Sequence, residues 1–96
     1  MQLDKKHKKK LLELAHSMSP VVMLSEKKGV TDNVLKAIDE ALLHHELIKI
    51  KVSFMLKADR AKVIQEISEK FTATVLREIG KVAILYRFNP ELDKHV

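Results

Sequence analysis

Apolar and polar side chains alternate from residue 48 to residue 54. The apolar members of the set are Ile48, Ile50, Val52 and Phe54, and the polar members are Lys49, Lys51 and Ser53. Successive side chains of a β-strand point to opposite faces of a sheet, so the pattern predicts a strand with one face in the core and the other in water. The side chains of Lys49 and Lys51 should then point from the uncovered face of the sheet.

The other segments follow from apolar spacing and from residues that begin or end helices. Helical spacing predicts helices over residues 4–17, 31–45 and 59–71, with Thr31 and Asp59 as the capping residues of the last two. Short apolar runs predict strands over residues 21–24, 73–79 and 82–87, the last two forming a hairpin around Gly80 and Lys81. The expected order is helix, strand, helix, strand, helix, strand, strand.

This order predicts an α/β (α+β) two-layer sandwich. Strand–helix–strand units close with a right-handed crossover, which puts both crossover helices on one face of a four-stranded mixed sheet. A chain of 96 residues supports one core, so we expect a single domain over residues 1–96. The tail, residues 89–96, contains Pro90 and mixed charge, and we expect it to be loosely held.

The net charge of +5 is concentrated at one end of the chain. Residues 1–10 contain five lysines against Asp4 alone, which accounts for +4 of that charge. Such a cationic end indicates an anionic partner. The apolar run of a signal peptide does not follow it, and no segment is apolar for long enough to span a bilayer, so we expect a cytoplasmic protein.

The first candidate site is the lysine-rich first helix. Its cationic side chains are Lys5, Lys6, Lys8, Lys9 and Lys10. A run of charges is often only the solvated face of a helix. These lysines repel one another, however, and a purely structural face would normally relieve that cost with several interspersed acids, whereas here only Glu13 is well placed. Both interpretations remain open from the residues alone.

The second candidate site is the loop that contains Lys27, Lys28 and Gly29 and leads into the Thr31 cap. The start of a helix presents unpaired N–H groups and the positive end of the helix dipole, which together attract anions. Gly29 allows a tight turn or a close approach of the backbone to a ligand. Possible secondary contacts are Lys49, Lys51 and Arg87.

Catalytic and metal-binding patterns are not found. The chain has no cysteine, no nucleophile elbow, no phosphate-binding loop motif and no convincing carboxylate pair. His44 and His45 are neighbours on a predicted helix and diverge by about 100°, which suits a shared metal ion poorly. We therefore expect neither an enzyme nor a bound cofactor or metal.

Three stretches and the order of elements resemble a known family. The stretches are residues 14–22, residues 44–51 (HHELIKIK) and residues 79–87. They resemble the CRM domain in its stand-alone bacterial form, the YhbY family. The resemblance implies a fold similar to the C-terminal domain of bacterial translation initiation factor three. It also implies RNA binding linked to assembly of the large ribosomal subunit, so the expected partner is ribosomal RNA or a precursor of that subunit. We expect the protein to be a monomer.

The resemblance further implies that RNA contacts the basic first helix and a Gly-x-x-Gly loop like that of KH domains. Here Glu26 stands where the first glycine is expected, and the loop that ends at Gly29 is one residue longer. We interpret Lys27 and Lys28 as replacing a backbone clamp by a charge contact. The two basic elements are expected to share one surface, as a bipartite grip on phosphates.

Two other partners are compatible with a basic helix. The alternative function is a protein-interaction module whose basic helix binds an acidic protein. A membrane-surface helix is less favoured, because the narrow apolar arc of this helix is already needed by the core.

Overall fold

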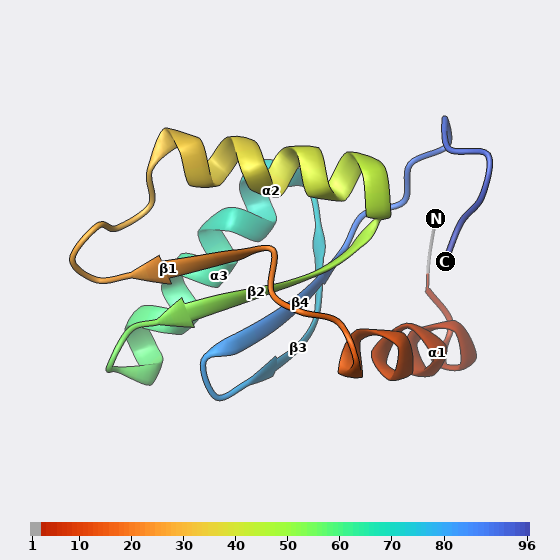
Figure 1. The fold of residues 1–96 in the computed structure, drawn as a ribbon. Helices are drawn as coiled ribbons and strands as arrows, with labels where there is room; N and C mark the ends of the chain where they lie inside the picture. Colours follow the sequence, from red (N-terminus) through yellow and green to blue (C-terminus); the bar gives the residue numbers. More distant parts are fainter. Residues whose placement is uncertain (1–2) are drawn as a thin grey trace.

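The computed structural model describes residues 3–96. Its helices and strands are, in chain order, α1 (Lys5–His16), β1 (Val22–Ser25), α2 (Asp32–His45), β2 (Leu47–Ser53), α3 (Lys57–Phe71), β3 (Thr74–Ile79) and β4 (Val82–Tyr86). The predicted order of elements is confirmed (Figure 1).

The four strands form one mixed sheet in the order β1-β2-β4-β3. β1 runs parallel to β2, while β4 is antiparallel to both β2 and β3. The β3–β4 hairpin turns at Gly80, whose φ of 56° is in the left-handed region that glycine adopts without strain. A β-bulge between Val75 and Arg77 shifts the register of β3 against β4. The predicted four-stranded mixed sheet is confirmed.

Helices α2 and α3 cover one face of this sheet, as predicted. The alternation in β2 places Ile48, Ile50 and Val52 in the main core. They pack there with side chains of the helices and of the neighbouring strands: Leu24, Ile38, Leu42, Ile64, Ile67 and Leu85.

Helix α1 covers part of the opposite face, a partial third layer that the two-layer description leaves out (Figure 1). Leu11 and Ala15 of α1 are fully buried against Leu47, Ile84 and Tyr86. The physical reason lies in β4, which is apolar on both faces and therefore needs cover on both. The helix docks at the end of the sheet where β2 begins and β4 ends.

The helix starts differ in one respect from the prediction. Thr31 caps α2 as expected, since its side chain accepts a hydrogen bond from the Val34 N–H at 3.2 Å. Asp59 is not the cap of α3, because that helix begins at Lys57 and Leu56 occupies the cap position without a side-chain hydrogen bond. Asp59 instead lies in the first turn, where a negative charge is favourable to the helix dipole.

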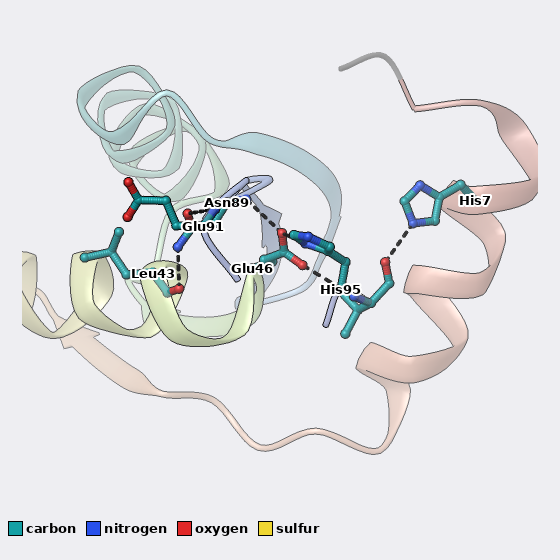
Figure 2. A network of polar contacts seen from close by, with 7 residues as sticks. His7, Leu43, Glu46, Asn89, Glu91 and His95 are labelled. Carbon is teal, nitrogen blue, oxygen red and sulfur yellow. Dashed lines mark hydrogen bonds and ion pairs between the residues drawn. The ribbon is translucent and has the colours of Figure 1, made fainter. Parts of the chain in front are cut away.

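The tail, residues 89–96, contains no helix or strand but makes several hydrogen bonds to the rest of the chain. The carboxylate of Glu46 accepts a hydrogen bond from the Asn89 N–H and another from Nδ1 of His95, both at 2.7 Å (Figure 2). Nε2 of His7 lies 3.0 Å from the carbonyl oxygen of Val96, which links the tail to α1. In the structure these contacts join the tail to Glu46 and to α1.

The reason for this anchoring is the burial of Glu46, which is 1% exposed just after α2. A buried carboxylate needs hydrogen-bond donors, and the tail supplies them. Burial by itself would raise the pKa of the Glu46 carboxyl. The hydrogen bonds from Asn89, His95 and Val96 outweigh that effect and hold the pKa below its ordinary value of 4.5.

Candidate nucleic-acid interface

Helix α1 presents its lysines to solvent. Leu11 and Ala15 hold one side of the helix on the sheet, and all five lysines of residues 5–10 are exposed on the rest of its circumference. Within residues 3–96 the ion pairs are Arg87 with Asp39 and His95 with Glu46, so no carboxylate pairs with a lysine of α1. The nearest acid in sequence, Asp4, caps the helix by accepting a hydrogen bond from the His7 N–H at 2.7 Å.

A groove runs between α1 and the β3 side of the sheet. It consists of two hollows of about 550 Å³ and 330 Å³ that share Leu12, His16 and Arg77 in their walls. The first hollow adds three lysines of α1 (Lys5, Lys8 and Lys9) together with Glu13, and the second adds Lys49 and the aliphatic side chains Ile79, Val82 and Ile84. We call these two hollows the α1–β3 groove; its walls carry five cationic side chains and one carboxylate.

The register of the sheet explains why cations from two strands meet there. Lys49 of β2 and Arg77 of β3 are both in register with Ile84 of β4, which belongs to the cluster under α1. In the next row, Lys51 and Ile79 are both in register with Val82. Side chains in register share a face, so both rows face the α1 side of the sheet.

Lys49 and Lys51 therefore lie on the predicted face, but that face is not fully uncovered. Both side chains are half-buried. The Nζ atom of Lys49 lies 3.5 Å from the carbonyl oxygen of His16, at the end of α1. Lys49 thus belongs to the wall between α1 and the sheet, whereas Lys51 lies one row farther from the helix.

The loop before α2 has the expected cationic and backbone features. Lys27 and Lys28 are exposed, and Gly29 has a φ of 65°. The Gly29 N–H donates to the Ser25 carbonyl at 2.8 Å, which closes the turn. A Cβ atom at Gly29 would meet nothing within 4 Å, so glycine is required there by the backbone angle and not by close packing.

The carboxylate of Glu26 is directed at the neighbouring loop. Its Oε1 atom accepts a hydrogen bond from the Met55 N–H, just after β2. This contact ties the loop that follows β1 to the loop that precedes α3. The residue that replaces the first expected glycine therefore has a structural partner inside the chain.

The two basic elements do not form one compact grip. Helix α1 packs on Leu47, where β2 begins, whereas the loop of Lys27 and Lys28 follows Ser25, which is in register with Ser53 at the end of β2. The six residue steps of β2 correspond to about 20 Å. The two elements lie toward opposite ends of the sheet (Figure 1), and Lys49 and Lys51 lie between them on the α1 face.

Arg87, predicted as a possible secondary RNA contact, binds other groups of the same chain. Its guanidinium donates to the Phe71 carbonyl at 3.1 Å and forms an ion pair with Asp39 at 3.1 Å. Its side chain is 20% exposed. The guanidinium therefore joins the middle of α2 and the end of α3 to the residue that follows β4, and Arg87 is not part of the interface proposed below.

Comparison with known proteins decides the family. The model of the CRS1/YhbY (CRM) domain matches residues 3–87 of the chain. The chain belongs to the CRM domain family. Relatives of this CRM domain include an "RNA-binding protein" of Haemophilus influenzae, 40% identical over 89 residues that cover 93% of this chain and 89% of the relative. A "Probable RNA-binding protein" of Pseudomonas aeruginosa is 33% identical over 96 residues, or 100% of this chain and 91% of the relative.

A solved structure has the same fold as this CRM domain. It is the solution structure of a hypothetical protein of Staphylococcus aureus for which RNA binding is suggested. The TM-score is 0.78 at 31% identity, and the match covers 97% of this chain and 95% of the other. The predicted family and fold class are thereby confirmed.

Reasoning from the sequence of this CRM domain missed Arg77. Strict alternation from Ala73 would put Val75 and Arg77 together on the face covered by α2 and α3. The bulge at Leu76 changes this, so that both Leu76 and Arg77 reach the α1 face. A bulge of this kind has no clear signal in a single sequence.

Within residues 3–96, no three histidine or acidic side chains are grouped closely enough to hold a metal ion. No helix in that part of the chain has the length and apolar character needed to cross a membrane.

Proposed function

We propose that this CRM domain binds RNA, with the lysines of α1 contacting phosphates. The observation that carries the proposal is a row of five exposed lysines without carboxylate partners among residues 3–96, on a helix packed against the sheet through Leu11 and Ala15. Phosphate contacts supply most of the affinity of such proteins. The names of the relatives from Haemophilus influenzae and Pseudomonas aeruginosa support RNA as the ligand.

The sheet extends this surface beyond the helix. Arg77 and Lys49 continue the cationic wall of the α1–β3 groove, and Lys51 continues it toward the loop of Lys27 and Lys28. The interface we propose is a track along one face of the sheet, with the loop at its far end. In the loop, Lys27 and Lys28 supply charge, and the start of α2 after Thr31 supplies the positive end of the helix dipole.

The more specific function that we propose is binding of ribosomal RNA in precursors of the large subunit, by a monomer in the cytoplasm. The resemblance to stand-alone bacterial CRM proteins supports this target. Crosslinking in cells followed by sequencing of the bound RNA tests it. Enrichment of large-subunit ribosomal RNA is expected, and a diffuse distribution over unrelated RNAs would contradict the specific target while leaving RNA binding intact.

Salt dependence tests the binding surface. If α1 neutralises about four phosphates, the logarithm of the affinity should fall against the logarithm of the salt concentration with a slope of roughly −3 to −4. The triple change Lys5→Glu, Lys6→Glu and Lys9→Glu should weaken binding strongly and flatten the slope. An unchanged slope would remove α1 from the interface.

A matched control distinguishes the effect of where the lysines lie from the effect of the net charge of the protein. The triple change Lys36→Glu, Lys62→Glu and Lys70→Glu alters the net charge equally, but these exposed lysines lie on α2 and α3, on the other side of the sheet. It should reduce affinity much less than the α1 change. If purified protein shows no salt-sensitive RNA binding and instead binds an acidic protein through α1, the protein-interaction alternative replaces the proposal.

A further inference from the structure

The α1–β3 groove differs from a surface that only contacts phosphates. Its lining combines cationic side chains with the aliphatic side chains of Leu12, Ile79 and Ile84. Ile79 is 56% exposed on the edge strand β3. The larger hollow, about 550 Å³, falls within the range of about 300–1,000 Å³ typical of small-ligand pockets.

Two planar side chains line both hollows of the groove, His16 at the end of α1 and Arg77 on β3. Arg77 has no carboxylate within ion-pair distance among residues 3–96, so its guanidinium is available to a ligand. Guanidinium and imidazole groups stack on nucleobases. The only tyrosine on this face, Tyr86, is buried beneath α1 and cannot serve as a stacking platform.

We propose that the α1–β3 groove receives an unpaired nucleotide of the RNA. The base lies on the Arg77 guanidinium and the aliphatic side chains, and the flanking phosphates contact lysines of α1 and Lys49. A base inside a duplex is stacked on both sides and cannot enter such a groove, whereas a base in a loop or bulge can be splayed out. The groove therefore gives this CRM domain a preference for RNA with unpaired nucleotides. The inference rests on the proposed RNA-binding function.

The test compares two RNAs by fluorescence anisotropy: a blunt duplex, and the same duplex carrying a bulge of unpaired nucleotides. The wild-type protein should prefer the bulged RNA by about tenfold, the size of one base-stacking contact. Arg77→Lys keeps the positive charge but removes the planar group. It should abolish most of this preference, because the loss of affinity should be larger for the bulged RNA than for the blunt duplex. The salt slope should stay close to that of the wild type, since the charge is kept.

Two further variants make the test specific. Arg77→Gln removes the charge as well, so it should weaken binding to both RNAs. Lys62→Gln, on the exposed side of α3, is the matched control and should leave the preference as it is in the wild type. Methyl resonances of Leu12, Ile79 and Ile84 should shift when the bulged RNA is added, and much less with the blunt duplex.

The outcomes separate this inference from the function on which it rests. If the wild type shows no preference, or if Arg77→Lys keeps it, the groove does not take a base. RNA binding still stands in that case, provided that charge reversal on α1 abolishes binding to both RNAs. If neither RNA binds the wild-type protein, both proposals fail together.

Discussion

Replacing Glu46 by glutamine should destabilise the protein substantially. The Glu46 carboxylate is 1% exposed and accepts hydrogen bonds from the Asn89 N–H and from Nδ1 of His95, each at 2.7 Å. Hydrogen bonds to a charged group contribute about 1.5–3 kcal/mol each. Both of these donors bond to Oε2, while Oε1 accepts from the Val96 N–H at 3.4 Å. Glutamine removes the charge that strengthens these bonds and must turn its NH₂ group toward at least one of the donors. We expect a loss of about 2–4 kcal/mol in the free energy of unfolding and a Tm lower by roughly 10–20 °C.

The stabilisation of the folded protein by the Glu46 carboxylate should depend on pH. Because the pKa of Glu46 in the folded protein lies below its ordinary value of 4.5, its stabilisation is present above that pH and is lost as the pH falls through the folded-state pKa. Thermal unfolding followed by circular dichroism should therefore show a large difference between wild type and Glu46→Gln at about pH 7 that narrows in acid.

A matched control is Glu40→Gln, the same change at an exposed position of α2, which should shift the Tm little. The reasoning would be refuted if Glu46→Gln melted within a degree or two of wild type, or if its deficit were the same in acid as at neutral pH.

Two other changes and one titration test separate parts of the structure. Leu11→Ala should lower the free energy of unfolding by about 2–5 kcal/mol, because Leu11 of α1 is fully buried against the sheet, and it should weaken RNA binding as α1 loosens. A chemical denaturation midpoint equal to wild type would contradict that packing. Gly29→Ala should lower the free energy of unfolding by about 1–2 kcal/mol. The backbone φ of 65° is the whole cause, since a Cβ atom at this position has open space around it. An unchanged free energy of unfolding would show that the loop rearranges. Burial raises the pKa of Tyr86, and the negative charge of Glu46 raises it further. The ultraviolet titration of this single tyrosine should therefore have its midpoint above 10.0. A midpoint at or below that value would place the Tyr86 side chain in solvent.

Local patterns in the sequence predicted most of the fold. The alternation in β2 placed Ile48, Ile50 and Val52 on the core side, and Thr31 was predicted as the cap of α2, because both features depend on neighbours in the sequence. The predicted cap of α3 was wrong, because the cap position is Leu56, three residues before Asp59, and its side chain makes no capping hydrogen bond.

Features that depend on distant segments could not be predicted in this way. The covering of Ile84 and Tyr86 by α1 follows from pairing between β2 and β4, and the position of Arg77 follows from a bulge that breaks alternation. Glu46 looks like an ordinary polar residue between a helix and a strand. Its role becomes evident only when the tail from Asn89 to Val96 reaches it across the fold.

The candidate site was predicted in its parts and not in its arrangement. The lysines of α1 are exposed and unpaired within residues 3–96, as a binding surface requires. Their distance from Lys27 and Lys28 could not be foreseen, because it depends on where α1 docks along β2. Arg87 was predicted as a possible RNA contact because it is a cation. The sequence gives no sign that its guanidinium will instead bind Asp39 and the carbonyl of Phe71.

Mapping bound RNA by amide chemical shifts is the most direct test of the central claim, that RNA lies along α1 and the adjoining sheet face. On titration with a bulged RNA, we predict the largest shifts at residues 5–16, Lys49 and Arg77, with smaller shifts at Lys27 and Lys28. Shifts confined to the exposed faces of α2 and α3, with α1 unperturbed, would contradict the account.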